Sequence, residues 1–187
     1  MIPSIILGVV LYITVQVLYR KSKNFAVVQS HWQHIFDGLK FSSEEFYKSV
    51  QELVESKEMP GVKISNQKFD ETNVYGADRI YLRIRRDESM FLVCAAPFGT
   101  GFFISWWYGE PVDWLKEILL SIPILGWIFV KTMYNRTLCK LDYDGMFSET
   151  VKQCVKEAIE NMIFVKGTKK LTEQEYKETV LTQLSVQ

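Results

Sequence analysis

Residues 80–108, IYLRIRRDESMFLVCAAPFGTGFFISWWY, carry the pattern from which the fold class is predicted. Its first part, residues 80–85, alternates between aliphatic side chains and larger polar or aromatic ones. Such alternation is typical of a strand with one buried face, because successive side chains of a strand point to opposite sides of the sheet. Arg83 and Arg85 fall on the exposed side, so the pattern predicts a strand with a cationic outer surface.

Two further strands follow within the same stretch. Residues 90–96 are apolar throughout, which predicts a central strand that is buried on both faces, and residues 102–108 return as an aromatic-rich strand. The connections at 87–88 and 97–101 are short, as in β-hairpins. With residues 62–69 as a first strand, the sequence predicts an antiparallel meander of four strands.

Helix signals stand on both sides of these strands. Ser42 and Glu45 have the spacing of a capping box, and the apolar stripe that follows them predicts a helix over 43–57. Asp144 is the predicted N-cap of the clearest amphipathic helix of the chain, whose apolar stripe extends to Met162.

Two shorter patterns complete the domain. Residues 137–143 are a candidate fifth strand, and Thr172 and Glu175 have the spacing of a second capping box, which predicts a last short helix. Runs of strands followed by runs of helices are typical of α+β proteins. We therefore predict an α+β fold in which helices cover an antiparallel meander of four to five strands.

The amino-terminal segment predicts a single transmembrane helix over 1–19. Residues 1–18 carry no charged side chain, and a helix of this length measures about 27 Å, close to the thickness of a bilayer's hydrocarbon core. Arg20, Lys21 and Lys23 follow, so the positive-inside rule places the amino terminus outside and the remainder in the cytoplasm. No small-residue cleavage site ends the run, as a signal peptide would require. The alternative is a buried helix of a soluble protein.

The chain is therefore expected to have four parts. They are a membrane anchor over 1–19, a juxtamembrane helix over 20–41, a cytoplasmic α+β domain over 42–167 and a C-terminal helix over 168–187. Only one of these parts is large enough to hold a hydrophobic core, so a single globular domain is expected.

The prediction of a juxtamembrane helix depends on one apolar stripe. Its members recur at spacings of three and four residues: Phe25, Val28, Trp32, Ile35 and Leu39. This spacing predicts one face of a helix, and it is also a coiled-coil seam of about two heptads. The stripe packs either on its own domain or on lipid, or it pairs residues 25–39 of two copies in a homo-oligomer.

A second hydrophobic segment, residues 112–134, follows the aromatic strand. Its uncharged part, residues 118–130, is about 20 Å long as a helix, too short to cross a bilayer. The segment is expected to form either a helical corner buried in the domain or an element that dips into the membrane interface, with Trp127, Ile128 and Phe129 leading.

The aromatic strand is the best candidate for a contact surface. Trp106 and Trp107 are neighbours in the sequence, so on a strand they face opposite sides and cannot both enter one core. One aromatic face is expected to pack under helices. The other face, with Phe103 and Trp107, meets either the chain's own helices or a partner, through residues 102–130.

The charge and the cysteine content of the chain limit the classes of partner and the compartment that are expected. The 22 basic residues equal the 22 acidic ones, so the chain has no net field suited to nucleic acid. The three cysteines are scattered singly, as reduced cytoplasmic thiols usually are. Membrane lipid is an expected partner, and the candidate contacts for anionic headgroups are Arg20, Lys21, Lys23, Arg83 and Arg85. The alternative for the arginines is a solvated strand face or salt pairing with Glu71, Asp78 or Glu88.

No motif for catalysis or for a cofactor stands out. His31 and His34 would share a helix face, but zinc needs three or four protein ligands, so no metal site is predicted. The stretch Gly99-Thr100-Gly101 lacks the third glycine of a dinucleotide loop and the lysine of a P-loop, and a hairpin turn explains it better. We therefore predict no cofactor and no enzymatic activity.

Two short segments carry a resemblance to a protein family. Residues 94–107, CAAPFGTGFFISWW, and residues 81–86, YLRIRR, resemble a segment of a family of uncharacterised bacterial membrane-anchored proteins. The likeness is confined to residues 81–107. The resemblance implies a location in the bacterial inner membrane, and it implies no particular activity or ligand.

Together these patterns predict a non-catalytic binding or scaffold module that is anchored in the inner membrane. Its cytoplasmic domain is expected to engage a protein partner or further copies of itself. The alternative is a domain that binds lipid or an apolar ligand, in which residues 112–134 form a lid or a membrane-dipping element.

Overall fold

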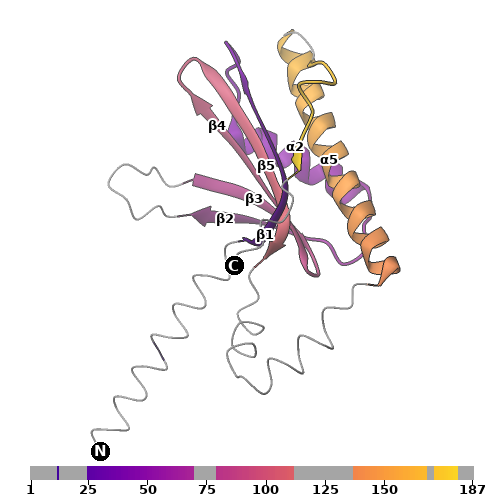
Figure 1. Ribbon diagram of the computed structural model, residues 1–187. Coiled ribbons are helices and arrows are strands. Elements are labelled where there is room, and N and C mark those ends of the chain that lie inside the picture. Colours follow the sequence, from indigo (N-terminus) through magenta and orange to yellow (C-terminus); the bar gives the residue numbers. More distant parts are fainter. Residues whose placement is uncertain (1–11, 13–24, 70–78, 112–136, 168–170, 181–187) are drawn as a thin grey trace, which may run out of the picture.

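The computed structural model describes residues 12, 25–69, 79–111, 137–167 and 171–180, which form an α+β fold (Figure 1). Its six strands make one antiparallel sheet in the order β2-β3-β4-β5-β1-β6. The strands are β1 (Phe25–Phe36), β2 (Lys63–Phe69), β3 (Arg79–Arg86), β4 (Ser89–Phe98), β5 (Gly101–Pro111) and β6 (Thr179–Val180). The helices are α2 (Ser43–Ser56) and α5 (Leu138–Lys166).

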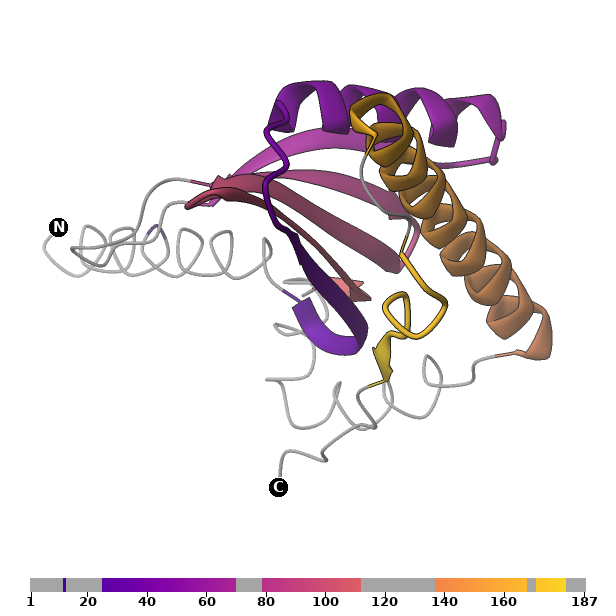
Figure 2. The ribbon, with the colours of Figure 1, turned by 90° about the horizontal axis from the view of Figure 1, so that it is seen from above.

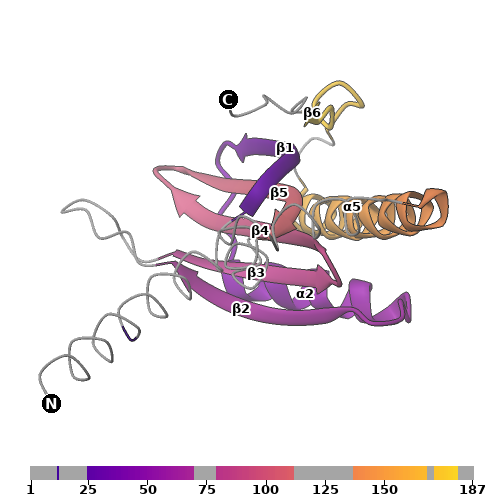
Figure 3. The same ribbon diagram turned by 60° about the horizontal axis from the view of Figure 1, so that its bottom comes forward.

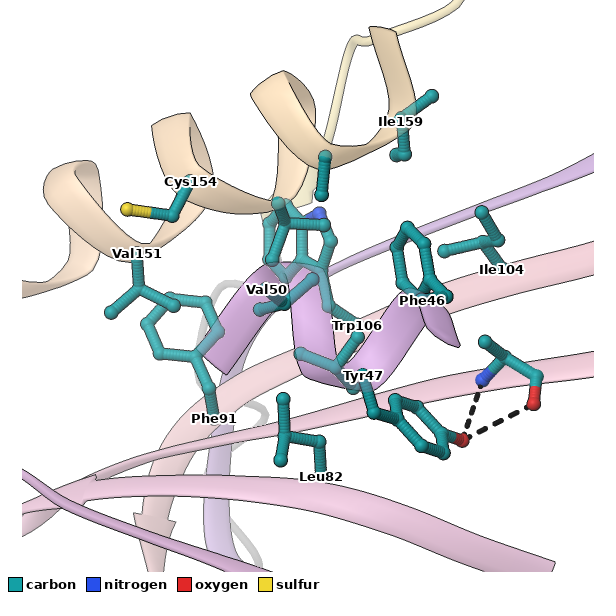
Figure 4. Close-up of a cluster of buried hydrophobic side chains, with 14 of the residues drawn as sticks. Phe46, Tyr47, Val50, Leu82, Phe91, Ile104, Trp106, Val151, Cys154 and Ile159 are labelled. Carbon is teal, nitrogen blue, oxygen red and sulfur yellow. Dashed lines mark hydrogen bonds between the residues drawn. The ribbon is translucent and has the colours of Figure 1, made fainter. Parts of the chain in front are cut away.

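Both helices lie on the same face of the sheet, as Figure 2 shows. Their buried side chains and those of the facing strands form one hydrophobic core (Figure 4). Five of its fully buried members are Phe46, Val50, Phe91, Val151 and Ile159. We call the opposite face of the sheet the outer face, because neither α2 nor α5 covers it.

The predicted meander is confirmed. Strands β2, β3, β4 and β5 are consecutive antiparallel neighbours and lie side by side in Figure 3. Gly99 in the β4–β5 turn has a φ of 59°, a left-handed conformation that favours glycine and that the hairpin interpretation requires. The sheet is larger than predicted, because β1 and β6 add two strands beside β5.

The helix predicted over 20–41 is wrong in its described part, because residues 25–36 form β1. This strand pairs with β5 along its length. Trp32 and Phe36 point into the core from alternate positions, as expected for a strand. Ser30 and His34 lie on the same core-facing side of β1 as Trp32 and Phe36. Because these two residues are polar, the sequence does not show the two-residue alternation that is typical of a strand. The coiled-coil stalk that the stripe suggested therefore does not form within β1.

Helix α5 confirms the amphipathic pattern but begins earlier than predicted. Thr137 is its N-cap, since its side chain accepts a hydrogen bond from the Lys140 N–H at 3.3 Å. The fifth strand predicted over 137–143 is therefore wrong, because these residues are the cap and first turns of the helix. Asp144 is not the N-cap either; it accepts a hydrogen bond from the Ser89 hydroxyl at 2.9 Å.

The C-terminal helix predicted over 168–187 is wrong for residues 171–180. Thr172 and Glu175 do interact, because the Glu175 carboxylate accepts bonds from the Thr172 N–H at 2.7 Å and from its hydroxyl at 2.8 Å. This pair closes a single turn. The chain then extends into β6, which pairs with β1 and so takes backbone hydrogen bonds from the sheet rather than from a helix.

Several predictions lie outside the described residues. These are the anchor over 1–19, the basic cluster at 20–23 and the hydrophobic segment 112–134. Within the part of the chain that the structure describes, no helix combines the length and the apolar character needed to cross a membrane.

The sheet divides where β3 and β4 separate. Their ladder ends at the pair of Tyr81 and Cys94, although both strands continue and keep their other neighbours. The two parts of the sheet diverge in Figure 1. Pro97 helps to end the ladder. Every second residue of a strand directs its N–H group to the same neighbouring strand, and the Ala95 N–H points to the β3 side. The next N–H on that side would belong to residue 97, which is a proline and has no N–H.

Tyr47 of α2 fills the gap between the separated strands. Its hydroxyl accepts a hydrogen bond from the Ala95 N–H at 2.8 Å and donates one to the Ile80 carbonyl oxygen at 2.7 Å. Figure 4 shows the bonding to β4 as dashed lines. Burial raises the pKa of the Tyr47 phenol far above its ordinary value. One side chain thus replaces the strand-to-strand bonds that are missing at this point.

Candidate functional site

The outer face of the sheet combines basic and aromatic side chains. Its basic members, placed by the strand registers, are Lys63, Arg79, Arg83 and Arg85. At the outer-face positions of the described strands β1 to β5 there is no carboxylate. Although the chain as a whole has balanced charge, this face is therefore cationic.

Arg83 and Trp107 lie in one row across this face. Arg83 is the register partner of Leu92, and Leu92 is the partner of Trp107. Since neighbouring strands are about 4.8 Å apart, the backbones of Arg83 and Trp107 are about 10 Å apart. The row continues to His31, whose ring stacks on the Trp107 indole with centroids 4.6 Å apart and an interplanar angle of 12°.

The predicted division of the two tryptophans is confirmed. Trp106 is 6% exposed and packs in the core against Phe91, with ring centroids 5.7 Å apart. Trp107 is half-buried on the outer face, and Phe103 is half-buried on the same face. Phe103 is the register partner of Ile35 on β1, which is 46% exposed. The outer face therefore carries partly exposed side chains at Phe103, Trp107 and Ile35, whereas Met90, Leu92 and Ser105 on the same face are buried.

The two predicted arginines are held in place by neutral acceptors. The Arg83 Nε donates to the Ser65 hydroxyl at 3.1 Å, and the Arg85 Nε donates to the Asp87 carbonyl oxygen at 3.0 Å. Neither arginine forms an ion pair with another described residue.

The remaining predicted contacts are outside the described residues: Arg20, Lys21, Lys23, Trp127, Ile128 and Phe129. The two histidines fall on opposite faces of β1, so they do not share a surface as they would on a helix. In the described ranges no three His, Cys, Asp or Glu side chains are grouped to hold a metal ion.

A cleft of about 670 Å³ opens between α2 and the separated ends of β3 and β4. Helix α2 contributes Glu44, Tyr47 and Lys48 to its walls, and the sheet contributes Asn66, Arg79 and Cys94. This volume is within the range of small-molecule sites. No sequence pattern indicates the cleft, although a proline near the end of a predicted strand is a known signal of a free strand edge.

Cys94 is the most deeply buried polar group of this cleft, with 1% exposure. Burial raises the pKa of its thiol, while the nearby Arg79 guanidinium and the Tyr81 and Tyr47 hydroxyls oppose the rise. The thiol is therefore neutral at ordinary pH and unsuited to nucleophilic attack. Its neighbour Arg79 forms no ion pair within the described residues.

A smaller cavity of about 300 Å³ lies between α5, β1 and the C-terminal turn. The Lys152 Nζ there pairs with a Glu178 carboxylate oxygen at 2.7 Å and lies 5.6 Å from the centre of the Trp106 ring. Lys156 lies 4.7 Å from the centre of the Tyr176 ring. Because these charged groups already have partners, we interpret this region as a structural connection.

Comparisons of the chain with protein-family models, with curated proteins and with solved structures found no match. The fold alone therefore defines the class: an α+β protein with a six-stranded antiparallel sheet that carries two helices on one face.

Proposed function

We propose that the protein is a membrane-anchored, non-catalytic binding module whose contact surface is the outer face of its sheet. One observation carries this proposal: cations and partly exposed aromatic side chains share a sheet face that has no carboxylate at its described strand positions. Aromatic residues and arginine are the side chains that dominate binding energy in protein interfaces. The outer face therefore suits a partner with an acidic surface.

The charge of this face favours a different protein over a second copy. In a two-fold symmetric dimer the same patch meets itself, so Arg83 and Arg85 would face the same cations on the other subunit. Bringing like charges together at an interface costs roughly several kcal/mol of binding free energy. The preferred occupant is an acidic segment of another protein at the membrane.

The proposed location rests on the sequence. An anchor over 1–19 is followed by only five residues before β1 begins at Phe25. Five residues span at most about 17 Å when fully extended, so the sheet stays near the membrane surface. The positive-inside rule and the family resemblance of residues 81–107 favour the cytoplasmic side of a bacterial inner membrane.

A second candidate, direct contact with anionic lipid, is favoured by one register pair. Phe25 at the start of β1 is the Cα partner of Pro111 at the end of β5. The two most hydrophobic segments of the sequence, 1–19 and 112–134, therefore join the sheet at the same place. An anchor in the first segment would deliver Trp127, Ile128 and Phe129 to the same interface, with Arg20, Lys21 and Lys23 near the headgroups.

Site-specific cross-linking of the full-length chain in its native membrane tests the proposal. A photo-reactive amino acid in place of Gln33, which is exposed on the outer face, is expected to cross-link one protein. The same amino acid in place of Gln51, exposed on α2, is the matched control and is expected not to capture that protein.

Charge reversal then identifies the contact. The double variant Arg83→Glu/Arg85→Glu is expected to lose the cross-link from position 33, whereas Lys177→Glu on the C-terminal turn retains it. Cross-linking to phosphatidylglycerol alone, lost in the same double variant, would support the lipid candidate instead. A cross-link unaffected by the double variant would contradict both candidates.

A further inference from the structure

We propose that the cleft between α2 and the separated strands β3 and β4 binds a small organic anion, whose carboxylate or phosphate group is held by Arg79 and Lys48. This site lies beside the surface proposed for the protein partner and shares Arg79 with it, but the proposal does not depend on a protein partner. Its volume of about 670 Å³ accommodates a small metabolite.

The cleft results from residues that keep the two strands apart. If β3 and β4 stayed paired beyond Tyr81 and Cys94, their backbones would close it. The Tyr47 hydroxyl binds both strands at 2.7 and 2.8 Å, and Pro97 removes the next donor on the β4 edge. The opening is therefore compatible with a stable fold, because the Ala95 N–H and the Ile80 carbonyl oxygen keep a partner.

The same residues argue against an added peptide strand as the occupant. A strand that pairs with β4 needs free N–H and C=O groups along its edge. Tyr47 already accepts the Ala95 N–H, its hydroxyl shares its one proton between the Ile80 and Ala95 carbonyl oxygens at 2.7 and 3.2 Å, and Pro97 has no N–H. A small molecule recognised by side chains fits this cleft better than an extended chain.

The charges of the walls favour an anion. Arg79 from β3 and Lys48 from α2 line the cleft, against a single carboxylate from Glu44. Lys48 is only weakly engaged, since its Nζ lies 3.9 Å from an exposed Glu52 carboxylate oxygen. The Arg79 guanidinium has no ion-pair partner within the described residues, and its planar fork matches two oxygens of a carboxylate or phosphate.

Thiol protection in the full-length chain, held in neutral detergent, tests the site. The variant Asn66→Cys places a thiol at an exposed position of the cleft lining, while Cys139 is exposed on α5 and serves as an internal reference. Inorganic phosphate and acetate are the probes, each compared with sodium chloride at the same ionic strength. We expect at least one probe to slow alkylation at position 66 of Asn66→Cys in a saturable manner and to leave the rate at Cys139 unchanged.

Two arginine variants on the same strand give a matched comparison. Arg79→Gln is expected to raise the probe concentration needed for half-protection by about tenfold, as loss of a charge-assisted pair predicts. Arg85→Gln, at the opposite end of β3, is expected to leave it unchanged. Arg79→Lys, which keeps the charge, gives an intermediate value and guards against a folding defect.

The proposal is overturned if neither probe protects position 66 in Asn66→Cys, or if adding Arg79→Gln leaves the protection unchanged. The double variant Arg83→Glu/Arg85→Glu separates the two proposals, because it reverses the charge of two outer-face residues that do not line the cleft. It should lose the protein partner while keeping protection by the anion.

Discussion

The indole Nε1 of Trp32 donates a hydrogen bond to the backbone oxygen of Glu175 at 2.7 Å. This bond joins the first strand of the sheet to the C-terminal turn, 143 residues later in the chain. The Trp32 and Tyr176 rings also stack, with centroids 5.9 Å apart, and Lys152 holds Glu178 from α5. The C-terminal turn is therefore a fixed part of the domain, although its own backbone closes only one turn.

Replacement of Trp32 by phenylalanine tests this connection. The variant keeps an aromatic ring and loses the donor, which leaves the buried side of the turn without its hydrogen bond at a cost of about 1–3 kcal/mol. We expect faster hydrogen–deuterium exchange over residues 171–180, with exchange over β3 and β4 unchanged. Trp107→Phe on the outer face is the control, and equal exchange of the turn in both variants would refute the role of the indole bond.

The hydrogen bonds of the Tyr47 hydroxyl lead to a second prediction. Tyr47→Phe leaves the Ala95 N–H and the Ile80 carbonyl oxygen without their partner, so we expect a loss of about 2–4 kcal/mol in the free energy of unfolding. The measurement is urea denaturation of the full chain in detergent, followed by tryptophan fluorescence. Tyr143→Phe, at a residue that is 52% exposed, should change stability by less than about 0.5 kcal/mol. Equal effects of the two substitutions would contradict the bridging role.

The meander was predictable because local signals agreed along it. Residues 80–85 alternate, residues 90–96 are apolar throughout, and short turns join them, so period and turn chemistry lead to the same structure. In β1 these signals conflicted. Ser30 and His34 sit on the core side, and five apolar residues happen to recur at helical spacing, so only pairing with β5 reveals the strand.

The outer face could be predicted in part, and the cleft could not. Alternation alone placed Arg83 and Trp107 on exposed sides of their strands, but their common row depends on the register of β3, β4 and β5. The cleft depends on contact between Tyr47 and two strands that come more than thirty residues later in the chain. No periodicity encodes such a contact, because it arises only when α2 packs on the sheet.

Gly109 gives a third prediction. A Cβ atom at this position would overlap the carbonyl oxygen of Val27, where β1 has an irregular register against β5. Gly109→Ala should therefore displace β1 and destabilise the fold by about 1–3 kcal/mol. Gly145→Ala in α5 is the matched control, because a Cβ atom there meets nothing within 4 Å and alanine favours a helix by about 1 kcal/mol. Opposite shifts in the urea midpoint are expected, and a stabilised Gly109→Ala variant would contradict the close approach.

The Tyr176 phenol predicts how stability depends on pH. Burial, with the nearby carboxylates of Glu160 and Glu175, raises its pKa from 10.0 to about 12. The unfolded chain loses this proton first as the pH rises, so the contribution to stability is constant below pH 10 and declines between pH 10 and about pH 12. Tyr176→Phe has no such proton, and its free energy of unfolding should fall less steeply between about pH 9 and about pH 11 than that of the unmodified chain. Parallel pH profiles in urea denaturation would show that the folded state does not hold this proton more tightly.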